Sequence, residues 1–268
     1  MKYLFSDWER LKAVLFDKSL LLLLDYDGTL TPIRESAFLA SLSKENKDLL
    51  SRFSKNPGCS LAIISGRSLE DIKGMVGLKG IIYAGNHGLQ IEGPKIKFES
   101  QVSPRLKLAM RNIAQDLRKR LSDIKGALIE DKGLTLSVHY RLVRKKDMPL
   151  LDKITSEVIN PYRVRNKIKI NSGKKVYEIK PPFKWDKGKV VLYLLARQQF
   201  ASKDKKVLPI YIGDDVTDED AFRAIKNKGL TVFVGKPKKS YAQYYLRNHN
   251  GVQSFLEKIY QIITVGCL

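Results

Sequence analysis

Leu20-Leu21-Leu22-Leu23-Leu24-Asp25-Tyr26-Asp27-Gly28-Thr29 is the stretch from which the fold can be inferred. Five consecutive leucines bounded by turn residues are typical of a strand buried on both faces, although periodicity alone also allows a buried helix segment. The run is far too short to cross a bilayer. If it is a strand, it places Asp25 and Asp27 at its carboxyl end, where ligands bind in open α/β sheets.

The two carboxylates suggest a cation site. Residues two apart in a strand point to the same side, so we expect Asp25 and Asp27 to lie on one face. Adjacent carboxylates repel each other, and a divalent cation relieves the repulsion. Gly28 lets the chain bend away. The alternative is a strand that ends in an ordinary Asp-Gly turn without chemistry.

The rest of the chain predicts a discontinuous α/β core, 1–100 plus 183–268, with an inserted α+β module at 101–182. Apolar runs alternate with helical patterns in both core segments, which favours parallel strands. The inserted module reads helix-hairpin-helix-hairpin, and Pro181-Pro182 ends it. For the core we expect strands at 20–24, 60–64, 80–84, 207–212 and 230–234, and helices at 43–53, 68–75, 186–197, 218–225 and 252–263. For the module we expect helices at 104–121 and 148–159, strands at 127–130, 134–140, 162–170 and 175–179, and turns at 131–133 and 171–173.

A second acidic cluster follows the expected strand at 207–212. It runs Gly213-Asp214-Asp215-Val216-Thr217-Asp218-Glu219-Asp220. The last three acids suit the first turn of a helix, where the helix dipole favours negative charge. Asp214 and Asp215 precede that helix, and together with Asp25 and Asp27 they predict a hard oxygen site suited to Mg²⁺.

Two further positions predict an anion beside these acids. Ser65 ends a strand, and the free amides of Gly66 and Arg67 open a helix, which is a common anion site. Lys187 opens a later helix, where its ammonium could balance both phosphate and carboxylates. Each feature alone is weak, since a Ser-Gly-Arg tripeptide is usually only a helix start and most lysines are solvated.

Composition limits the class of protein. The chain has 268 residues, 43% of them hydrophobic, and a net charge of +21. The charge raises the question of a nucleic-acid partner. The basic residues are spread along the chain, however, so a lysine-rich surface is the favoured interpretation and nucleic-acid binding is judged unlikely. With only Cys59 and Cys267, no signal peptide and no membrane-length segment, we expect a cytoplasmic protein with no membrane partner.

These motifs resemble those of the haloacid dehalogenase superfamily. The four superfamily motifs match Asp25-Tyr26-Asp27-Gly28-Thr29, Ser65, Lys187 and Gly213 through Asp218. The inserted module is similar to the larger type of cap domain in that superfamily. Closer similarity is to the trehalose-6-phosphate phosphatase family, and it lies in Asp25 through Ile33, Ile64-Ser65-Gly66-Arg67, Gly85-Asn86-His87-Gly88, Gly213 through Phe222, Glu130 through Gly133, His139-Tyr140-Arg141 and Glu178-Ile179-Lys180-Pro181.

The resemblance implies a Rossmann-like α/β core, a cap domain and Mg²⁺-dependent hydrolysis of a sugar phosphate. Asp25 would attack phosphorus to form an aspartyl-phosphate, and Asp27 would act as general acid and then as general base. Mg²⁺ would be bound by Asp25, the Asp27 carbonyl and Asp214. Ser65 and Lys187 would bind the phosphoryl group. Asp218 would hold Lys187 or a metal-bound water, and Asp215 would lie behind the metal ligands.

Substrate choice would fall largely to the cap. The residues expected to bind substrate are Gly66, Arg67, Asn86, His87 and Gly88 in the core and Glu130, Lys132, His139, Arg141 and Glu178 in the cap. The cap residues have an equally good alternative interpretation without a role in binding. Glu130 and Lys132 could be solvent-exposed charges of a hairpin turn, and His139 and Arg141 could lie on the outward face of a strand. Segment 101–182 carries 20 Lys/Arg against 8 Asp/Glu, a surplus of 12 that could attract a phosphorylated sugar.

Other functions stay open on the sequence. The same core would serve another glycosyl-phosphate phosphatase or a phosphomannomutase-like phosphotransferase. A nucleic-acid-associated protein is less favoured because aromatic residues near the basic stretches are sparse. An inactive regulatory subunit is less favoured because the acid set is intact. Trehalose 6-phosphate is the expected substrate, and a synthase partner, if there is one, is expected to be a separate chain.

Overall fold

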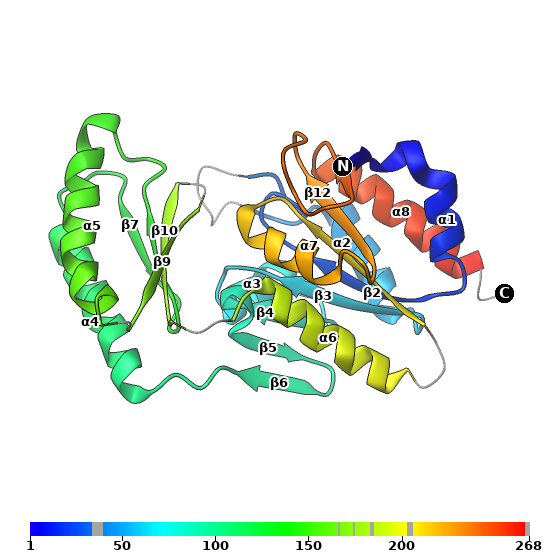
Figure 1. The fold of residues 1–268 in the computed structure, drawn as a ribbon, viewed down its shortest axis with the longest axis horizontal. Helices are drawn as coiled ribbons and strands as arrows, with labels where there is room; N and C mark the ends of the chain where they lie inside the picture. Colours follow the sequence, from blue (N-terminus) through cyan, green and yellow to red (C-terminus); the bar gives the residue numbers. More distant parts are fainter. Residues whose placement is uncertain (34–39, 166, 174, 183–184, 203–205, 266–268) are drawn as a thin grey trace. The chain divides into compact units, whose positions relative to one another are not determined.

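A computed structural model describes residues 1–268 except 34–39, 166, 174, 183–184, 203–205 and 266–268. The chain divides into two compact units (Figure 1). One comprises Met1–Phe98 and Trp185–Leu268, and the other comprises Glu99–Lys184.

The first unit is built on one mixed sheet. In the part of the chain that the structure describes, nine strands follow the order β1-β13-β12-β11-β2-β3-β4-β5-β6. In this order, every neighbouring pair from β1 at the edge through to β4 is parallel. The next strand, β5, is antiparallel to β4. This is the mostly parallel α/β sheet that the sequence predicts. The strands are β1 (Lys2–Tyr3), β2 (Ser19–Leu24), β3 (Cys59–Ile64), β4 (Ile82–Gly85), β5 (Gln90–Gly93), β6 (Ile96–Glu99), β11 (Val207–Gly213), β12 (Leu230–Val234) and β13 (Tyr244–Leu246).

Helices cover both faces of this sheet, and the leucines of β2 alternate between them. Leu20, Leu22 and Leu24 pack in one apolar cluster with residues of α1, α2, α3 and α8. Leu21 and Leu23 pack in the other cluster, with residues of α6 and α7. All five leucines are fully buried, so the strand interpretation of 20–24 is confirmed. The helices are α1 (Trp8–Leu15), α2 (Lys44–Lys55), α3 (Leu69–Val76), α6 (Lys187–Ala201), α7 (Glu219–Ile225) and α8 (His249–Val265).

The second unit is a four-stranded antiparallel sheet with two helices. Its strand order is β7-β8-β10-β9. Apolar residues of α4 and α5 form one core with those of the sheet, among them Ile113, Val138 and Ile179. The elements are α4 (Pro104–Arg120), β7 (Leu128–Asp131), β8 (Leu136–His139), α5 (Met148–Arg163), β9 (Lys169–Gly173) and β10 (Val176–Lys180).

Two predictions for this unit were wrong in their boundaries. Tyr162 was expected to begin a strand, but α5 continues to Arg163 because Tyr162 extends the apolar stripe of Leu151, Val158 and Ile159. The segment 171–173 was expected to be a turn. It belongs to β9, which pairs with β10 up to Gly173 opposite Val176.

Several core elements were not predicted. These are β1, α1, the pair β5 and β6, and the short strand β13. The strand expected at 80–84 begins at Ile82, since Gly80 has a positive φ of 80°.

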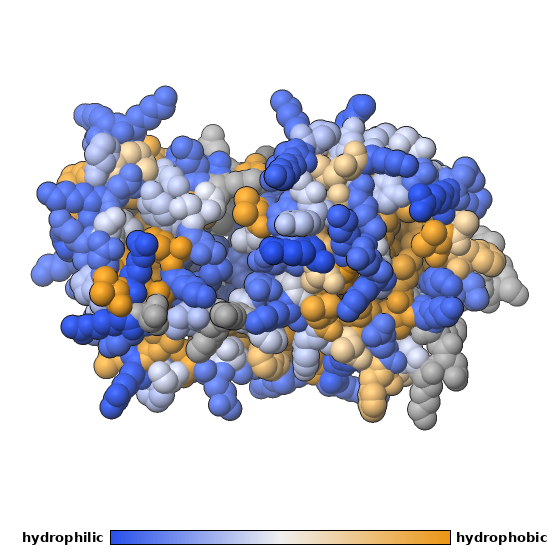
Figure 2. Space-filling model, in the orientation of Figure 1, coloured by the Kyte–Doolittle hydropathy of each residue, from blue (hydrophilic) through white to orange (hydrophobic). Residues whose placement is uncertain are grey.

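The surface is polar over much of the visible face (Figure 2). The basic side chains of Arg111, Arg118 and Lys119 on α4 are exposed. Among the described residues, no helix is both long enough and apolar enough to span a membrane.

Candidate active site

The candidate site lies at the carboxyl ends of β2, β3 and β11. Leu24 pairs with Ile63 on one side and with Ile212 on the other, so the residues that follow these strands meet at one edge of the sheet. The Asp25 amide continues the pairing and donates to the Ile212 carbonyl at 3.0 Å. Asp25 and the segment after Ile212 are thereby fixed to rigid strands.

Lys187 joins the two acidic segments. Its Nζ lies 2.6 Å from Oδ1 of Asp25 and 2.6 Å from Oδ1 of Asp218. The Lys187 side chain is 3% exposed, and it stands at the first residue of α6. Gly188 makes this position possible, because a Cβ there would lie 2.5 Å from the Asp220 carbonyl oxygen.

Asp218 organises the loop after β11 and is completely buried. Besides the bond from Lys187, its Oδ1 accepts one from the Tyr211 hydroxyl at 2.7 Å. Its Oδ2 accepts from the amides of Asp214 and Asp215 at 2.9 and 2.8 Å. Both oxygens are thus used by the protein itself, and the loop is folded around them.

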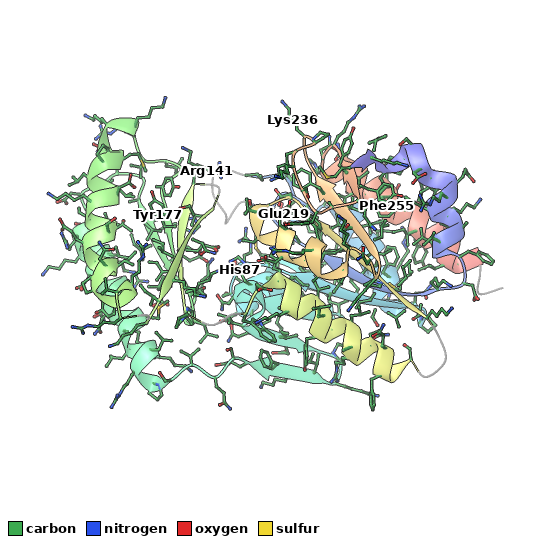
Figure 3. All side chains as sticks on the ribbon, in the orientation of Figure 1. His87, Arg141, Tyr177, Glu219, Lys236 and Phe255 are labelled. Carbon is green, nitrogen blue, oxygen red and sulfur yellow. The ribbon has the colours of Figure 1, made fainter. Side chains whose placement is uncertain are left out.

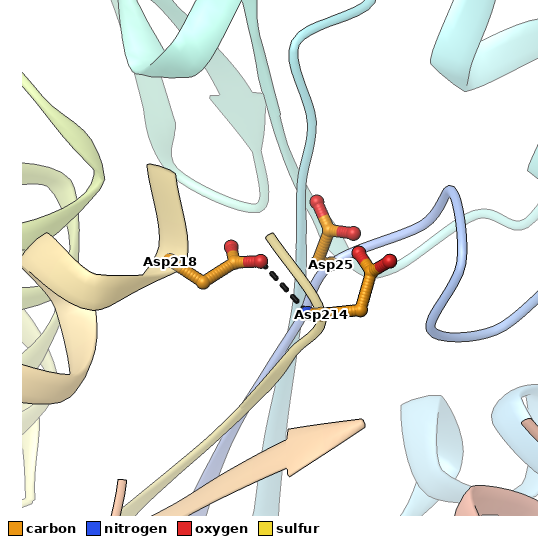
Figure 4. Close-up of side chains that lie close together, drawn as sticks. All are labelled: Asp25, Asp214 and Asp218. Atoms are coloured by element: carbon orange, nitrogen blue, oxygen red, sulfur yellow. Dashed lines mark hydrogen bonds between the residues drawn. The ribbon is translucent and has the colours of Figure 1, made fainter. Parts of the chain in front are cut away.

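Asp25, Asp214 and Asp218 form a group that could bind a metal ion. One carboxylate oxygen of each lies within 4.8 Å of the others, and all three residues are buried (Figure 4). Because Asp218 already accepts four hydrogen bonds, we expect Asp25 and Asp214 to be the direct ligands. A glycine makes the cradle possible: a Cβ at Gly28 would lie 2.1 Å from Oδ2 of Asp214. The donor set is all oxygen, which fits a hard divalent metal.

The electrostatics of the cluster also fit a cation. Burial raises the pKa of Asp25 well above its usual range, and the negative charges of Asp218 and Asp214 add to the rise while Lys187 opposes it. Burial acts to lower the pKa of Lys187, but the facing carboxylates of Asp218 and Asp25 raise it well above its ordinary value. The Lys187 ammonium contacts two of the three buried acids, Asp25 and Asp218. A divalent cation beside Asp25 would favour its ionised, nucleophilic form.

Asp27 does not share this environment. β2 ends at Leu24, so strand alternation does not extend to Asp27, and the Asp27 side chain is 42% exposed whereas that of Asp25 is 7% exposed. Asp27 instead accepts two hydrogen bonds from Arg67, Nε to Oδ2 at 2.7 Å and Nη2 to Oδ1 at 2.6 Å. Arg67 also donates to Asp71 at 3.0 Å.

The loop after β3 is held by the loop after β4. The amides of Asn86 and His87 donate to the carbonyls of Arg67 and Ser65 at 2.6 and 2.9 Å. Asn86 and His87 have positive φ values of 52° and 55°, a strained conformation that turns both amides toward those carbonyls. Figure 3 labels His87 at this turn.

Gly88 and Ser65, in the same two loops, also make hydrogen bonds that involve the backbone. The Trp185 indole donates to the Gly88 carbonyl at 2.8 Å. The Ser65 hydroxyl accepts from the Arg67 amide at 3.1 Å, and Ser65 is 1% exposed. Gly66 lies between the two, at the start of the loop that leads to α3.

In the second unit, three of the predicted residues form one cluster. His139 Nε2 lies 2.7 Å from Oε2 of Glu130, and Lys132 Nζ lies 3.6 Å from the same oxygen. Glu178 is on β10, and β8 separates it from Glu130, since both pair with Ser137. Arg141 follows β8 (Figure 3).

Two residues of the site were missed by the sequence interpretation. Tyr211 is the one polar-tipped side chain among the residues 207–212, and this interruption of an apolar strand could have marked it. Asp71 lies four residues after Arg67, a spacing that brings two side chains of a helix start together.

Comparison with known proteins places the chain in a family. A family model described as trehalose-phosphatase matches residues 23–250. The chain is 36% identical over 254 residues to a protein named probable trehalose-phosphate phosphatase D from Arabidopsis thaliana, covering 90% of this chain and 67% of that one. It is 34% identical over 270 residues to trehalose 6-phosphate phosphatase RA3 from Zea mays, covering 95% and 73%.

Solved structures show the same fold. The C-terminal domain of trehalose-6-phosphate phosphatase from C. albicans superposes with a TM-score of 0.82 at 23% identity, covering 97% of this chain and 99% of that one. A haloacid dehalogenase-like hydrolase from Bacteroides thetaiotaomicron superposes with a TM-score of 0.63 at 18% identity, covering 90% and 100%. The match over most of the length of the chain shows that this protein belongs to the trehalose-phosphatase family.

Proposed function

We propose that this protein hydrolyses trehalose 6-phosphate to trehalose and phosphate, in the biosynthesis of trehalose, with Asp25 as nucleophile. The observation that carries the proposal is the buried contact of Lys187 with Asp25 and Asp218, inside an acid group that could bind a metal. The names of the curated relatives supply the substrate.

The reaction would proceed in two displacements. Asp25 attacks phosphorus as the bond from phosphorus to the sugar oxygen breaks, and Asp27 gives that oxygen a proton. Water then attacks the aspartyl-phosphate, Asp27 takes its proton, and Asp25 is regenerated. Asp25 is 5% exposed, whereas the side chain of Asp27 is 42% exposed, which suits a group that exchanges protons with substrate and water.

A divalent metal, which we propose to be Mg²⁺, would be bound by the carboxylates of Asp25 and Asp214 and by the Asp27 carbonyl. When bound, it supplies positive charge to the phosphoryl oxygens. The protein adds the Lys187 ammonium, the Ser65 hydroxyl and the amide of Gly66, whereas the Arg67 amide, which the sequence predicted to be free, donates to the Ser65 hydroxyl. Asp218 and Asp215 shape the loop that presents Asp214.

We propose that segment 101–182 is the cap and that segments 1–100 and 183–268 are the catalytic core. Carboxylates and basic side chains recognise sugar hydroxyls through directional hydrogen bonds. The cap residues proposed for this role are Glu130, Lys132, His139, Arg141 and Glu178, and Asn86, His87 and Gly88 are proposed to assist from the core.

We place the reaction in the cytoplasm. The buried thiol of Cys59 is a free cysteine, as a reducing compartment would maintain it; Cys267 lies outside the described residues. The partner of the protein is then a small sugar phosphate, and a synthase that forms this ester would be a separate chain.

Phosphate release tests the proposal. The protein is assayed on trehalose 6-phosphate and on about twenty other sugar phosphates, with Mg²⁺ and after its removal by a chelator. We expect release from trehalose 6-phosphate above the others, loss of release without metal, and none from Asp25→Asn. Unchanged turnover by that variant would contradict the assignment of the nucleophile. Equal release from every ester would contradict the choice of sugar.

A further inference from the structure

We propose that Arg67 is a positioning residue: its guanidinium fixes the Asp27 carboxylate in the orientation for proton transfer, and the side chain serves Asp27 rather than the phosphoryl group. The proposal rests on the proposed function, in which Asp27 is the acid and base. It reassigns a side chain that the sequence placed among the substrate-binding residues.

The first observation is the geometry of the pair. Arg67 donates from Nε to one oxygen of Asp27 and from Nη2 to the other, at 2.7 and 2.6 Å. Two parallel bonds between a planar guanidinium and a carboxylate fix both the distance and the rotation of the carboxylate. A single ammonium would fix only the distance.

The second observation is that Arg67 is itself immobile. Its third nitrogen, Nη1, donates to Asp71 at 3.0 Å, and Asp71 is held on the first turn of α3. At the backbone, its amide donates to the Ser65 hydroxyl and its carbonyl accepts from Asn86. Both ends of Arg67 are thus anchored before any substrate arrives.

The third observation is the contrast in exposure. The Arg67 side chain is 6% exposed, while that of Asp27 is 42% exposed. Burial acts against the charged guanidinium, but the hydrogen bonds and negative charges of Asp27 and Asp71 raise the pKa of Arg67, which stays charged. The Arg67 guanidinium is buried, and the Asp27 carboxylate that it binds is partly exposed. This is the arrangement expected when one residue positions another that reacts with substrate.

Orientation of this kind has a large effect on rate. A reactive group displaced by about 1 Å can lose roughly 10²-fold in rate, because proton transfer requires close alignment. The effect falls on the step that needs the proton. A poor leaving group such as a sugar alkoxide needs the acid, whereas nitrophenolate leaves without a proton.

The experiment therefore compares two esters. Arg67→Lys keeps the positive charge and removes the two-point contact. On trehalose 6-phosphate we expect kcat to fall about 10²-fold, with KM changed less than about twofold. In a single turnover of p-nitrophenyl phosphate, release of nitrophenolate should stay within about threefold of wild type, because that step does not use Asp27. Asp71→Asn, which leaves Arg67 in place but frees its far end, should show the same selective loss to a smaller degree.

Controls separate this role from the alternatives. Arg52→Lys changes an exposed arginine that stacks on Tyr260 in the same unit and should leave both esters unaffected. Thermal unfolding of each variant establishes that the compared proteins are folded. If Arg67→Lys raises KM for both esters alike, Arg67 binds phosphate and the proposal is wrong. It is equally wrong if both folded variants keep wild-type kcat on the sugar ester.

Failure of the proposed function would look different. If wild-type protein hydrolyses another sugar phosphate in place of trehalose 6-phosphate, the substrate assignment fails. The same comparison on that ester still decides the role of Arg67, because the argument depends on the leaving group and not on the identity of the sugar.

Discussion

The Nζ atom of Lys187 lies 2.6 Å from Oδ1 of Asp25, the carboxylate proposed to attack phosphorus. Both side chains are nearly inaccessible, at 3% and 7% exposure. The positive charge of the ammonium balances the negative charge of the Asp25 carboxylate. A second contact, with Asp218, fixes the position of the ammonium beside Asp25. These contacts within the protein hold Asp25 and Lys187 in place, and the role of each residue can be tested by a single substitution.

Asp218→Asn should destabilise the protein strongly. The change removes a buried charge that pairs with Lys187 and accepts from two amides and the Tyr211 hydroxyl. Breaking a buried ion pair from one side costs about 3–5 kcal/mol of unfolding free energy. Urea denaturation measures this loss, and phosphate release should fall below detection.

Tyr211→Phe is the matched control for Asp218→Asn. It removes one hydrogen bond from the same carboxylate and leaves the charge, so we expect a loss of about 1 kcal/mol and most of the activity retained. Equal destabilisation by the two variants would show that the charge of Asp218 does not matter to the loop.

Gly28→Ala should weaken metal binding. The added Cβ would lie 2.1 Å from Oδ2 of Asp214, so that this carboxylate must move, and the φ of 87° is strained for any side chain. We expect the Mg²⁺ concentration for half-maximal activity to rise at least tenfold. Gly133→Ala provides the comparison, since its φ is 76° but no atom lies within 4 Å of its Cβ. That variant should lose about 1–2 kcal/mol of stability from backbone strain and keep the Mg²⁺ response of wild type. A parallel shift in both variants would trace the effect to strain.

Much of the core could be predicted because its information is local. The leucine run, the positions of Asp25 and Asp214 after apolar strands, and the helix starts near residues 43 and 68 all follow from short patterns. The partner of Asp27 could not be predicted. Its pairing with Arg67 joins residues 40 positions apart, and no local pattern shows which side chain will meet the Asp27 carboxylate.

The second unit was harder to predict for a related reason. The pattern of α5 is readable up to Ile159, but Tyr162 has strand propensity and helix periodicity at once, and packing decided for the helix. Short strands such as β1 and β13 are two and three residues long, too short for any periodicity to appear. The network around Asp218 likewise includes Tyr211. The Tyr211 hydroxyl can donate to Asp218 only after the loop that carries Asp218 has folded back over the end of the strand.

Glu130→Gln should impair recognition of the sugar and leave the phosphoryl chemistry intact. Its carboxylate lies beside His139 and Lys132, in a cluster proposed to bind hydroxyls. Loss of one charged hydrogen bond corresponds to at least about a tenfold rise in KM for trehalose 6-phosphate. Hydrolysis of p-nitrophenyl phosphate, which has no sugar, should be unchanged. Glu157→Gln in the same unit, which removes an exposed ion pair with Arg120, should affect neither substrate. If Glu130→Gln slows both esters equally, its role is structural.

Cys59 should make the stability of the protein depend on pH above 9. Burial raises the pKa of its thiol from 9.0 to about 12, so the folded state keeps a proton that the unfolded state releases. Between these two pKa values the thiol ionises in the unfolded chain but not in the folded protein, which lowers the free energy of the unfolded chain. The free energy of unfolding therefore falls as pH rises through this range, by about 1.4 kcal/mol between pH 8 and pH 10. Other groups also titrate there, so the measurement is a difference: urea unfolding of wild type and Cys59→Ala at both pH values. Cys59→Ala should be the less stable protein at pH 8 because it leaves a cavity, and the gap between the two should narrow by about 1.4 kcal/mol at pH 10. A gap that stays constant would mean that the thiol titrates alike in the folded and unfolded chains.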